Sequence, residues 1–114
     1  MTTDITGLSA RDLARLIRRR EVSAVEATEA VLARIEDRAD LNAFITVCAD
    51  EARAEARAAD DRVRAAEDPD TLPPLLGVPY SVKDLTLTRG VRTTMGSAIF
   101  RDFVPAEDAV AVAR

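Results

Sequence analysis

The 114-residue chain contains no histidine, no tryptophan and a single cysteine, Cys48. Without histidine, these residues cannot assemble a Ser-His-Asp or Cys-His catalytic set or a histidine-containing metal site. One cysteine cannot close an internal disulfide, which favours a reducing, cytoplasmic setting. We interpret Cys48 as a small buried residue at a strand end, because nothing near it in the sequence favours a reactive thiolate.

Other features are scarce as well. Aromatic residues make up 4% of the chain, and alanine supplies much of its 47% hydrophobic content, so the expected core is modest. The four glycines are isolated, which excludes a glycine-rich phosphate loop. The net charge is −4 with basic and acidic residues interleaved, which argues against direct nucleic-acid binding. No apolar run approaches the length of a membrane span, and we expect no membrane partner, cofactor or metal.

What is present begins with strong helix signals. Ser9 is placed as an N-cap, and Ser23 with Glu26 has the spacing of a capping box. These signals predict a helical hairpin over residues 8–38. We interpret the three arginines at positions 18–20 as a solvated helix end without a binding role, since acids surround them.

The rest of the chain alternates patterns. Residues 41–47 are rich in β-branched and aromatic side chains and predict a strand, and residues 49–67 predict a surface helix that packs through alanines. Four-residue spacing pairs Asp60 with Arg64 on its exposed side. A proline-rich linker over 68–76 follows, and a last helix is expected to run from Ala106 to Arg114 after Pro105.

The stretch over 77–97 is predicted to contain a strand, the lysine Lys83 and a hydroxyl-rich loop. The carboxyl end of a strand in an α/β sheet is a usual place for ligands. A lysine desolvated there loses preference for its charged form and can accept a proton, so Lys83 is a candidate general base. A structural lysine that reaches solvent or pairs with Asp84 is the alternative. Ser81 is a candidate hydroxyl partner for Lys83. A strand residue that makes local hydrogen bonds is the better interpretation of Ser81.

The residues Gly77-Val78-Pro79-x-x-Val82-Lys83-Asp84, followed by the loop 90–97 and Asp108-Ala109-Val110, resemble the N-terminal region of amidase signature enzymes. The resemblance extends from Leu8 to Arg114. It implies an α/β fold with a mixed central sheet flanked by helices, of which only the N-terminal portion is present. It also implies a Ser-cis-Ser-Lys mechanism with Lys83 as the catalytic lysine, acting on a small-molecule amide to release an acid and ammonia or an amine.

The chain departs from the family at one point. The family's two serines lie in a Gly/Ser-rich segment downstream of the lysine, and no such segment follows Lys83 here. Ser97 corresponds to a loop near the site and does not replace them. We therefore expect an N-terminal fragment that is inactive alone, and its substrate-binding residues and any homo-oligomer are not predicted.

Two alternatives stay open. Within the family, the chain resembles the A subunit of aspartyl/glutamyl-tRNA amidotransferase, whose loop usually carries Cys-Ala where this chain has Met95 and Gly96, a difference that favours a general amidase. From another class, the chain fits a non-catalytic helical interaction module or a degenerate remnant.

Overall fold

The computed structural model describes residues 4–114, which divide into two compact units. The first unit comprises residues 4–42 and 49–79, and the second comprises residues 43–48 and 80–114. The first holds three α-helices: α1 (Ala10–Arg18), α2 (Ala24–Asp37) and α3 (Ala49–Ala65). The second holds the short helix α4 (Val110–Ala113). No helix within residues 4–114 combines the length and apolarity that a membrane crossing requires.

Helix α1 begins and ends at identifiable caps. The Ser9 hydroxyl accepts the Asp12 N–H at 3.1 Å, as the sequence predicted. At the other end Arg20 takes a positive φ of 62°, with hydrogen bonds from Arg20 N–H to Ile17 O and from Glu21 N–H to Leu16 O. The Arg20 guanidinium then donates to the carbonyls of Val63 and Arg64 in the last turn of α3. Arg20 therefore stabilises the C-terminal ends of both α1 and α3. The sequence analysis, which interpreted residues 18–20 as a solvated helix end, did not predict this role.

Helix α2 starts with every nearby N–H group satisfied. Ser23 and Glu26 form the predicted capping box. The first two N–H groups of the helix, from Ala24 and Val25, donate to the Asp60 carboxylate of α3 at 2.7 and 3.1 Å. Asp60 therefore does not pair with Arg64 as its spacing predicted, and Arg64 bonds Asp61 instead. A negative charge at a helix N-terminus is favourable, which explains why Asp60 binds the start of α2 and not Arg64.

Replacing Asp60 with alanine is expected to lower the free energy of unfolding of the chain by about 2 kcal/mol, because two N–H groups lose their acceptor. Urea unfolding followed by circular dichroism at 222 nm measures the change. Asp61→Ala is the matched control: its side chain is exposed and bonds only Arg64, so it should cost under about 0.5 kcal/mol. Equal losses for both variants would contradict this account.

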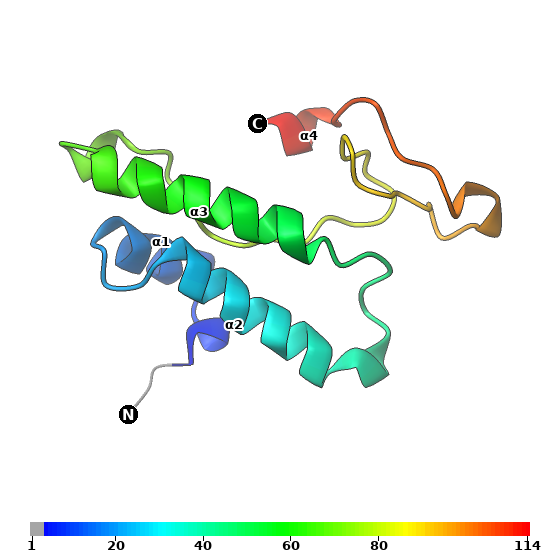
Figure 1. Ribbon diagram of the computed structural model, residues 1–114, viewed down its shortest axis with the longest axis horizontal. Coiled ribbons are helices and arrows are strands. Elements are labelled where there is room, and N and C mark those ends of the chain that lie inside the picture. Colours follow the sequence, from blue (N-terminus) through cyan, green and yellow to red (C-terminus); the bar gives the residue numbers. More distant parts are fainter. Residues whose placement is uncertain (1–3) are drawn as a thin grey trace. The chain divides into compact units, whose positions relative to one another are not determined.

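Helices α2 and α3 lie side by side and antiparallel (Figure 1). Their seam is made of small residues, with Ala24 and Ala27 fully buried on α2 and Ala56 and Ala59 buried on α3. Arg53 and Glu29 form a bidentate pair at the seam's edge. The predicted alanine-packed helix over 49–67 is thus confirmed, and it supports α2 directly.

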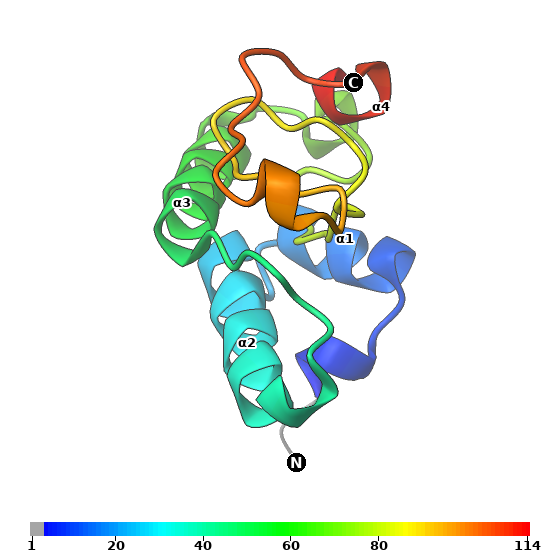
Figure 2. The same cartoon turned by 90° about the vertical axis from the view of Figure 1, so that its right-hand side faces the viewer.

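Helix α1 lies across α2 instead of alongside it (Figure 2), so the antiparallel partner of α2 is α3 and not α1 as the hairpin over 8–38 implied. The core of this unit gathers Leu13 and Ile17 of α1 with Ala27 and Val63. Leu72, Leu76 and Val78 from the following segment pack against it. The proline-rich linker is therefore part of the core and more than a spacer.

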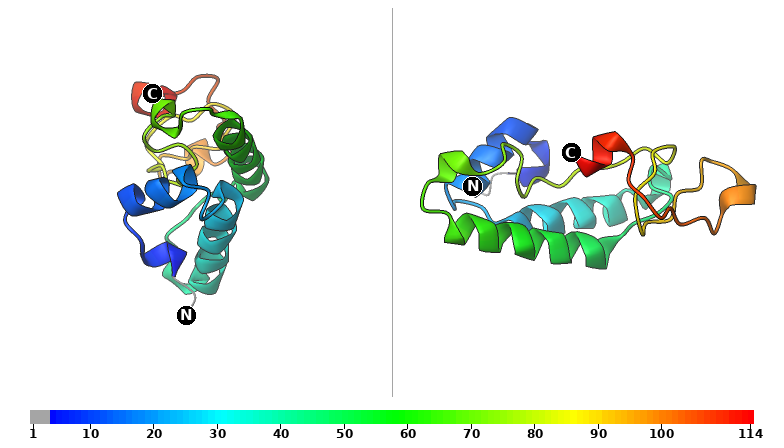
Figure 3. Two further views of the ribbon diagram at one scale, coloured as in Figure 1. Left: turned by 90° about the vertical axis from the view of Figure 1, so that its left-hand side faces the viewer. Right: turned by 90° about the horizontal axis from the view of Figure 1, so that it is seen from above.

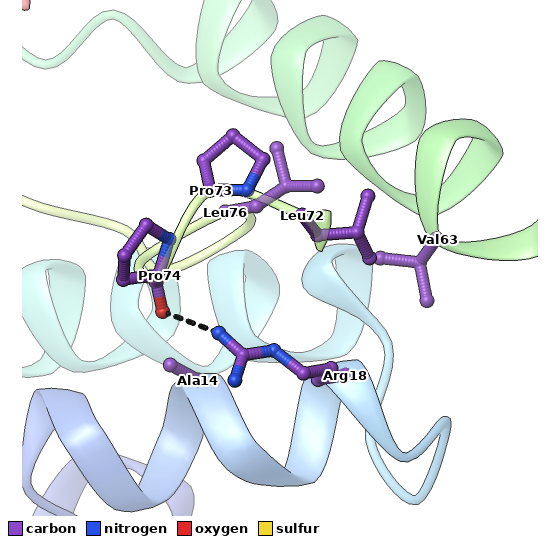
Figure 4. Close-up of a pocket in the computed structure, with 7 residues that line it drawn as sticks. All are labelled: Ala14, Arg18, Val63, Leu72, Pro73, Pro74 and Leu76. Carbon is purple, nitrogen blue, oxygen red and sulfur yellow. Dashed lines mark hydrogen bonds between the residues drawn. The ribbon is translucent and has the colours of Figure 1, made fainter. Parts of the chain in front are cut away.

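The linker is held to α1 by one long hydrogen bond. Arg18 donates to the Pro74 carbonyl at 3.2 Å across a small hollow (Figure 4). The other residues that line the hollow are Ala14, Val63, Leu72, Pro73 and Leu76. The side chains around this hollow are packed closely enough to leave no room for a ligand. The contact is structural.

The strands predicted over 41–47 and at the start of 77–97 are not formed, because residues 4–114 contain no strand. The predicted mixed sheet is therefore not confirmed. Residues 39–41 form a 3₁₀ turn, Asn42 takes a left-handed φ of 49°, and 43–48 make no backbone hydrogen bond to another described segment. Residues 80–82 are equally unpaired. A β-rich pattern needs a second segment to complete a ladder, and no described segment supplies one here.

The second unit consists mainly of loops (Figure 3). Backbone hydrogen bonds hold these loops together. Segments 87–93 and 103–109 run antiparallel through Ala109 N–H to Leu87 O, Gly90 N–H to Pro105 O and Thr93 N–H to Phe103 O. The Asp108 carboxylate accepts the Arg89 N–H at 2.6 Å. Because Asp108 and Ala109 are engaged in this way, the last helix starts at Val110 and not at Ala106 as predicted.

Candidate functional site

Lys83 occupies the first position of a turn in the second unit. The Thr86 N–H donates to the Lys83 carbonyl at 2.9 Å, which closes the turn over residues 83–86. The polar turn residues follow an apolar run, as the sequence indicated, but that run is not a strand. The backbone of Lys83 is thus held by a local hydrogen bond.

The side chain of Lys83 is exposed, so the predicted desolvation at the end of a buried strand is not observed. The neighbouring residues explain the difference, because Tyr80 is 71% exposed and Val82 is 38% exposed in the absence of a covering layer. Within residues 4–114 Lys83 makes no ion pair with a carboxylate. Its catalytic role stays a prediction.

Asp84 turns toward the loop over residues 93–97. Its carboxylate accepts the Thr94 N–H at 2.8 Å, the Thr94 hydroxyl, and the Gly96 N–H at 3.4 Å, while its carbonyl accepts the Met95 N–H at 2.9 Å. We call this set of four hydrogen bonds the Asp84 clasp. Among the described residues there is no ion pair between Asp84 and Lys83, and the exposed Lys83 side chain matches the other alternative, a lysine that reaches solvent.

The donors of the clasp determine the charge of Asp84. The Thr94 hydroxyl and N–H, with smaller contributions from the Gly96 N–H and the Arg92 charge, hold the pKa of the Asp84 carboxyl below its usual range. A group whose pKa is lowered on folding stabilises the fold above its unfolded pKa and loses that effect as the pH falls through the folded pKa.

Acidification below pH about 4 is therefore expected to loosen the 93–97 loop, because protonated Asp84 gives up part of its acceptor capacity. Amide chemical shifts of Thr94 and Gly96, followed by NMR between pH 7 and pH 2, measure the effect. In Asp84→Asn these shifts should be altered already at pH 7 and should no longer follow this titration. A wild-type titration centred at or above the ordinary aspartate pKa of about 3.9 would contradict the prediction.

The loop held by the clasp is also braced from its other side. Thr93 and Thr94 are buried, at 3% and 5% exposure, although both are polar. The Thr93 N–H donates to Phe103 O at 3.0 Å and its hydroxyl to Val91 O at 3.1 Å. The positive φ of Met95 and Gly96, 54° and 68°, turns the chain back toward Asp84.

The remaining candidates are not gathered at this site. Ser81 is exposed two residues before Lys83, and Ser97 uses its hydroxyl to accept the Ile99 N–H at 3.3 Å as the cap of a 3₁₀ turn. Cys48 is half-buried. In the part of the chain that the structure describes, no three His, Cys, Asp or Glu side chains converge as a metal would require.

One signal in the sequence pointed to this site and was missed. Lys83 is the only lysine, and every other basic residue is arginine. Arginine stays charged at any ordinary pH, whereas lysine can give up its proton. A chain that otherwise uses arginine throughout therefore has a deprotonatable cation at one position. Asp84 carried no comparable local signal.

The Lys83 turn and the clasped loop lie in a part of the chain that also matches a known family by sequence. The Amidase family model matches residues 26–114, and the chain belongs to this family. The match includes Lys83, Asp84 and the whole 93–97 loop.

The relatives found by sequence are named as the A subunit of glutamyl-tRNA(Gln) amidotransferase. The one from Geobacter sulfurreducens is 49% identical over 94% of this chain and 21% of its own length. Those from Roseiflexus sp. and Salinispora tropica are 46% and 48% identical, over 94% and 98% of this chain. The chain thus spans about a fifth of the length of the curated relatives it matches.

Proposed function

We propose that these residues supply the catalytic lysine of an amidase-type acyl-transfer site. In this proposal the neutral amine of Lys83 accepts a proton from a serine hydroxyl, and that serine activates a second serine for attack on an amide carbonyl. The C–N bond breaks, ammonia or an amine leaves with a proton, and an acyl-enzyme forms. The observation that carries the proposal is the single lysine of the chain, which lies on a hydrogen-bonded turn and makes no ion pair with a carboxylate among residues 4–114. The resemblance assigns the family's lysine to this position.

The two serines and the sheet partners are proposed to come from family regions beyond these 114 residues. The unpaired segments 43–48 and 80–82 would gain ladders there, and cover over Tyr80 and Val82 would desolvate Lys83. By this account the 114 residues are an N-terminal fragment and have no amide-hydrolysing activity alone.

We further propose that the site belongs to the A subunit of a glutamine-dependent amidotransferase. The carrying observation is that relatives 44–50% identical to this chain bear that name. The general amidase favoured by Met95 and Gly96 is the competing prediction, and the substrate decides between them.

The test uses a chimera in which residues 1–114 replace the matching segment of the Geobacter sulfurreducens relative, assembled with the other subunits of that enzyme. Glutamine hydrolysis and amide transfer to glutamyl-tRNA(Gln) are measured beside the hydrolysis of simple amides. Turnover of glutamine with transfer supports the amidotransferase, while turnover of simple amides alone supports the general amidase. A folded, assembled chimera that hydrolyses neither glutamine nor simple amides would contradict the proposal.

A further inference from the structure

Asp84 has more contacts to the 93–97 loop than a surface carboxylate needs. Its two carboxylate oxygens and its carbonyl accept four hydrogen bonds from three consecutive loop residues. Two of the donors come from Thr94, which is 5% exposed. Three donors around one ionised side chain, with a fourth on its backbone carbonyl, are typical of a position that the fold holds rigidly.

The clasp acts on the residue next to it. Asp84 is the second residue of the turn that Lys83 opens, and the Thr86 N–H closes that turn on the Lys83 carbonyl. Loop 93–97 is in turn fixed by Thr93 to Phe103. The backbone of Lys83 is therefore connected through Asp84 to a loop that is anchored independently.

We propose that Asp84 is the positioning residue for Lys83, and that Thr94 is its essential partner. The inference rests on the proposed function, because it assigns to the clasp the task of placing the base. Asp84 touches no reacting atom. It holds the turn in place and directs its own carboxylate into the loop, which leaves the Lys83 amine without an ion-pair partner beside it. Arg92 is the other charge that acts on the carboxylate, and its guanidinium donates to the Arg101 carbonyl.

The test compares Asp84→Asn, Thr94→Val, Thr94→Ser and the double variant D84N/T94V in the chimera. We expect each of the first two to lower kcat at least about 10-fold with KM within about 2-fold, because a base displaced by under an ångström transfers protons poorly. Thr94→Ser, which keeps the hydroxyl donor, should restore turnover to within about 3-fold of wild type. The double variant should lose no more than the worse single variant, since both act through one clasp.

Thr71→Val is the control, since its hydroxyl bonds only the Asp68 carbonyl in the first unit, and it should leave kcat unchanged. Amide exchange of Thr94, Gly96 and Thr86 in the 114-residue chain gives a second measurement that does not depend on activity. Asp84→Asn should speed exchange at all three positions and should leave exchange at the amides of α2 and α3 unchanged.

The failures are distinguishable. An assembled wild-type chimera without turnover contradicts the proposed function, whatever the variants do. An active chimera in which Asp84→Asn and Thr94→Val keep full kcat, or lose activity through KM alone, overturns the positioning role. Unchanged exchange at Thr86 in Asp84→Asn overturns it as well, because the turn is then held without the clasp.

Discussion

Gly77→Ala is expected to lower the free energy of unfolding of this chain by about 3 kcal/mol, for two separate reasons. Gly77 has a φ of 83°, a conformation that costs a residue with a Cβ roughly 1–2 kcal/mol. A Cβ at this position would also lie 2.9 Å from the Ala24 Cβ and 3.2 Å from Ile17 Cγ2. Both neighbours are buried, at 0% and 1% exposure, so neither can move away without disturbing the seam of α2.

The chain offers two matched controls for this variant. Gly90 has a similar φ of 74°, but no atom lies within 4 Å of the position that a Cβ would take, so Gly90→Ala should cost only the backbone part, roughly 1–2 kcal/mol. Gly7 needs no positive φ and its nearest neighbour lies at 3.6 Å, so Gly7→Ala should be nearly neutral. Urea unfolding at 222 nm ranks the three variants. Equal losses at Gly77 and Gly90 would show that the packing contribution is absent.

Lys83→Arg in the chimera is expected to lower kcat by about 10³-fold while the protein still folds and assembles. The substitution keeps a positive charge and a long side chain but removes the ability to become a neutral amine at accessible pH. Because Lys83 is exposed and makes no ion pair in the described chain, the change should leave the stability of the 114 residues within about 0.5 kcal/mol of wild type. The loss would therefore be chemical and not structural.

Arg89→Met is the control for a lost cation in the same unit, since only its backbone N–H makes a hydrogen bond, and it should retain turnover. Single-turnover measurements of acyl-enzyme formation locate the defect of Lys83→Arg at the first chemical step. A variant that kept more than a tenth of the wild-type kcat would show that Lys83 is not the base.

Much of the helical part was predictable because its signals are local. Ser9, Ser23 and Glu26 act on N–H groups within three residues of themselves, and the structure contains each of these contacts. The helix over 49–67 was likewise predicted from its spacing of alanines. In the structure it ends two residues earlier than predicted, at Ala65. Family membership was predicted from short motifs of contiguous residues. The same motifs singled out Lys83 as the candidate catalytic residue.

The contacts that decide the site were not predictable in this way. Sequence spacing predicted that Asp60 pairs with Arg64 and allowed Asp84 to pair with Lys83. In the structure the Asp60 carboxylate instead accepts an N–H group 36 residues away. The Asp84 carboxylate accepts one 10 residues away. Similarly, the pattern of 41–47 and 77–82 is that of strands, yet a strand exists only where another segment completes the ladder.

Local sequence was thus sufficient for the three long helices, for their caps and for membership of the Amidase family. Three further features emerged only in the folded chain: Lys83 is exposed, Asp84 belongs to the 93–97 loop, and Gly77 lies against Ile17 and Ala24. The reason is physical: caps and periodicity depend on neighbours within one helical turn, whereas burial and carboxylate partners depend on which distant segments meet.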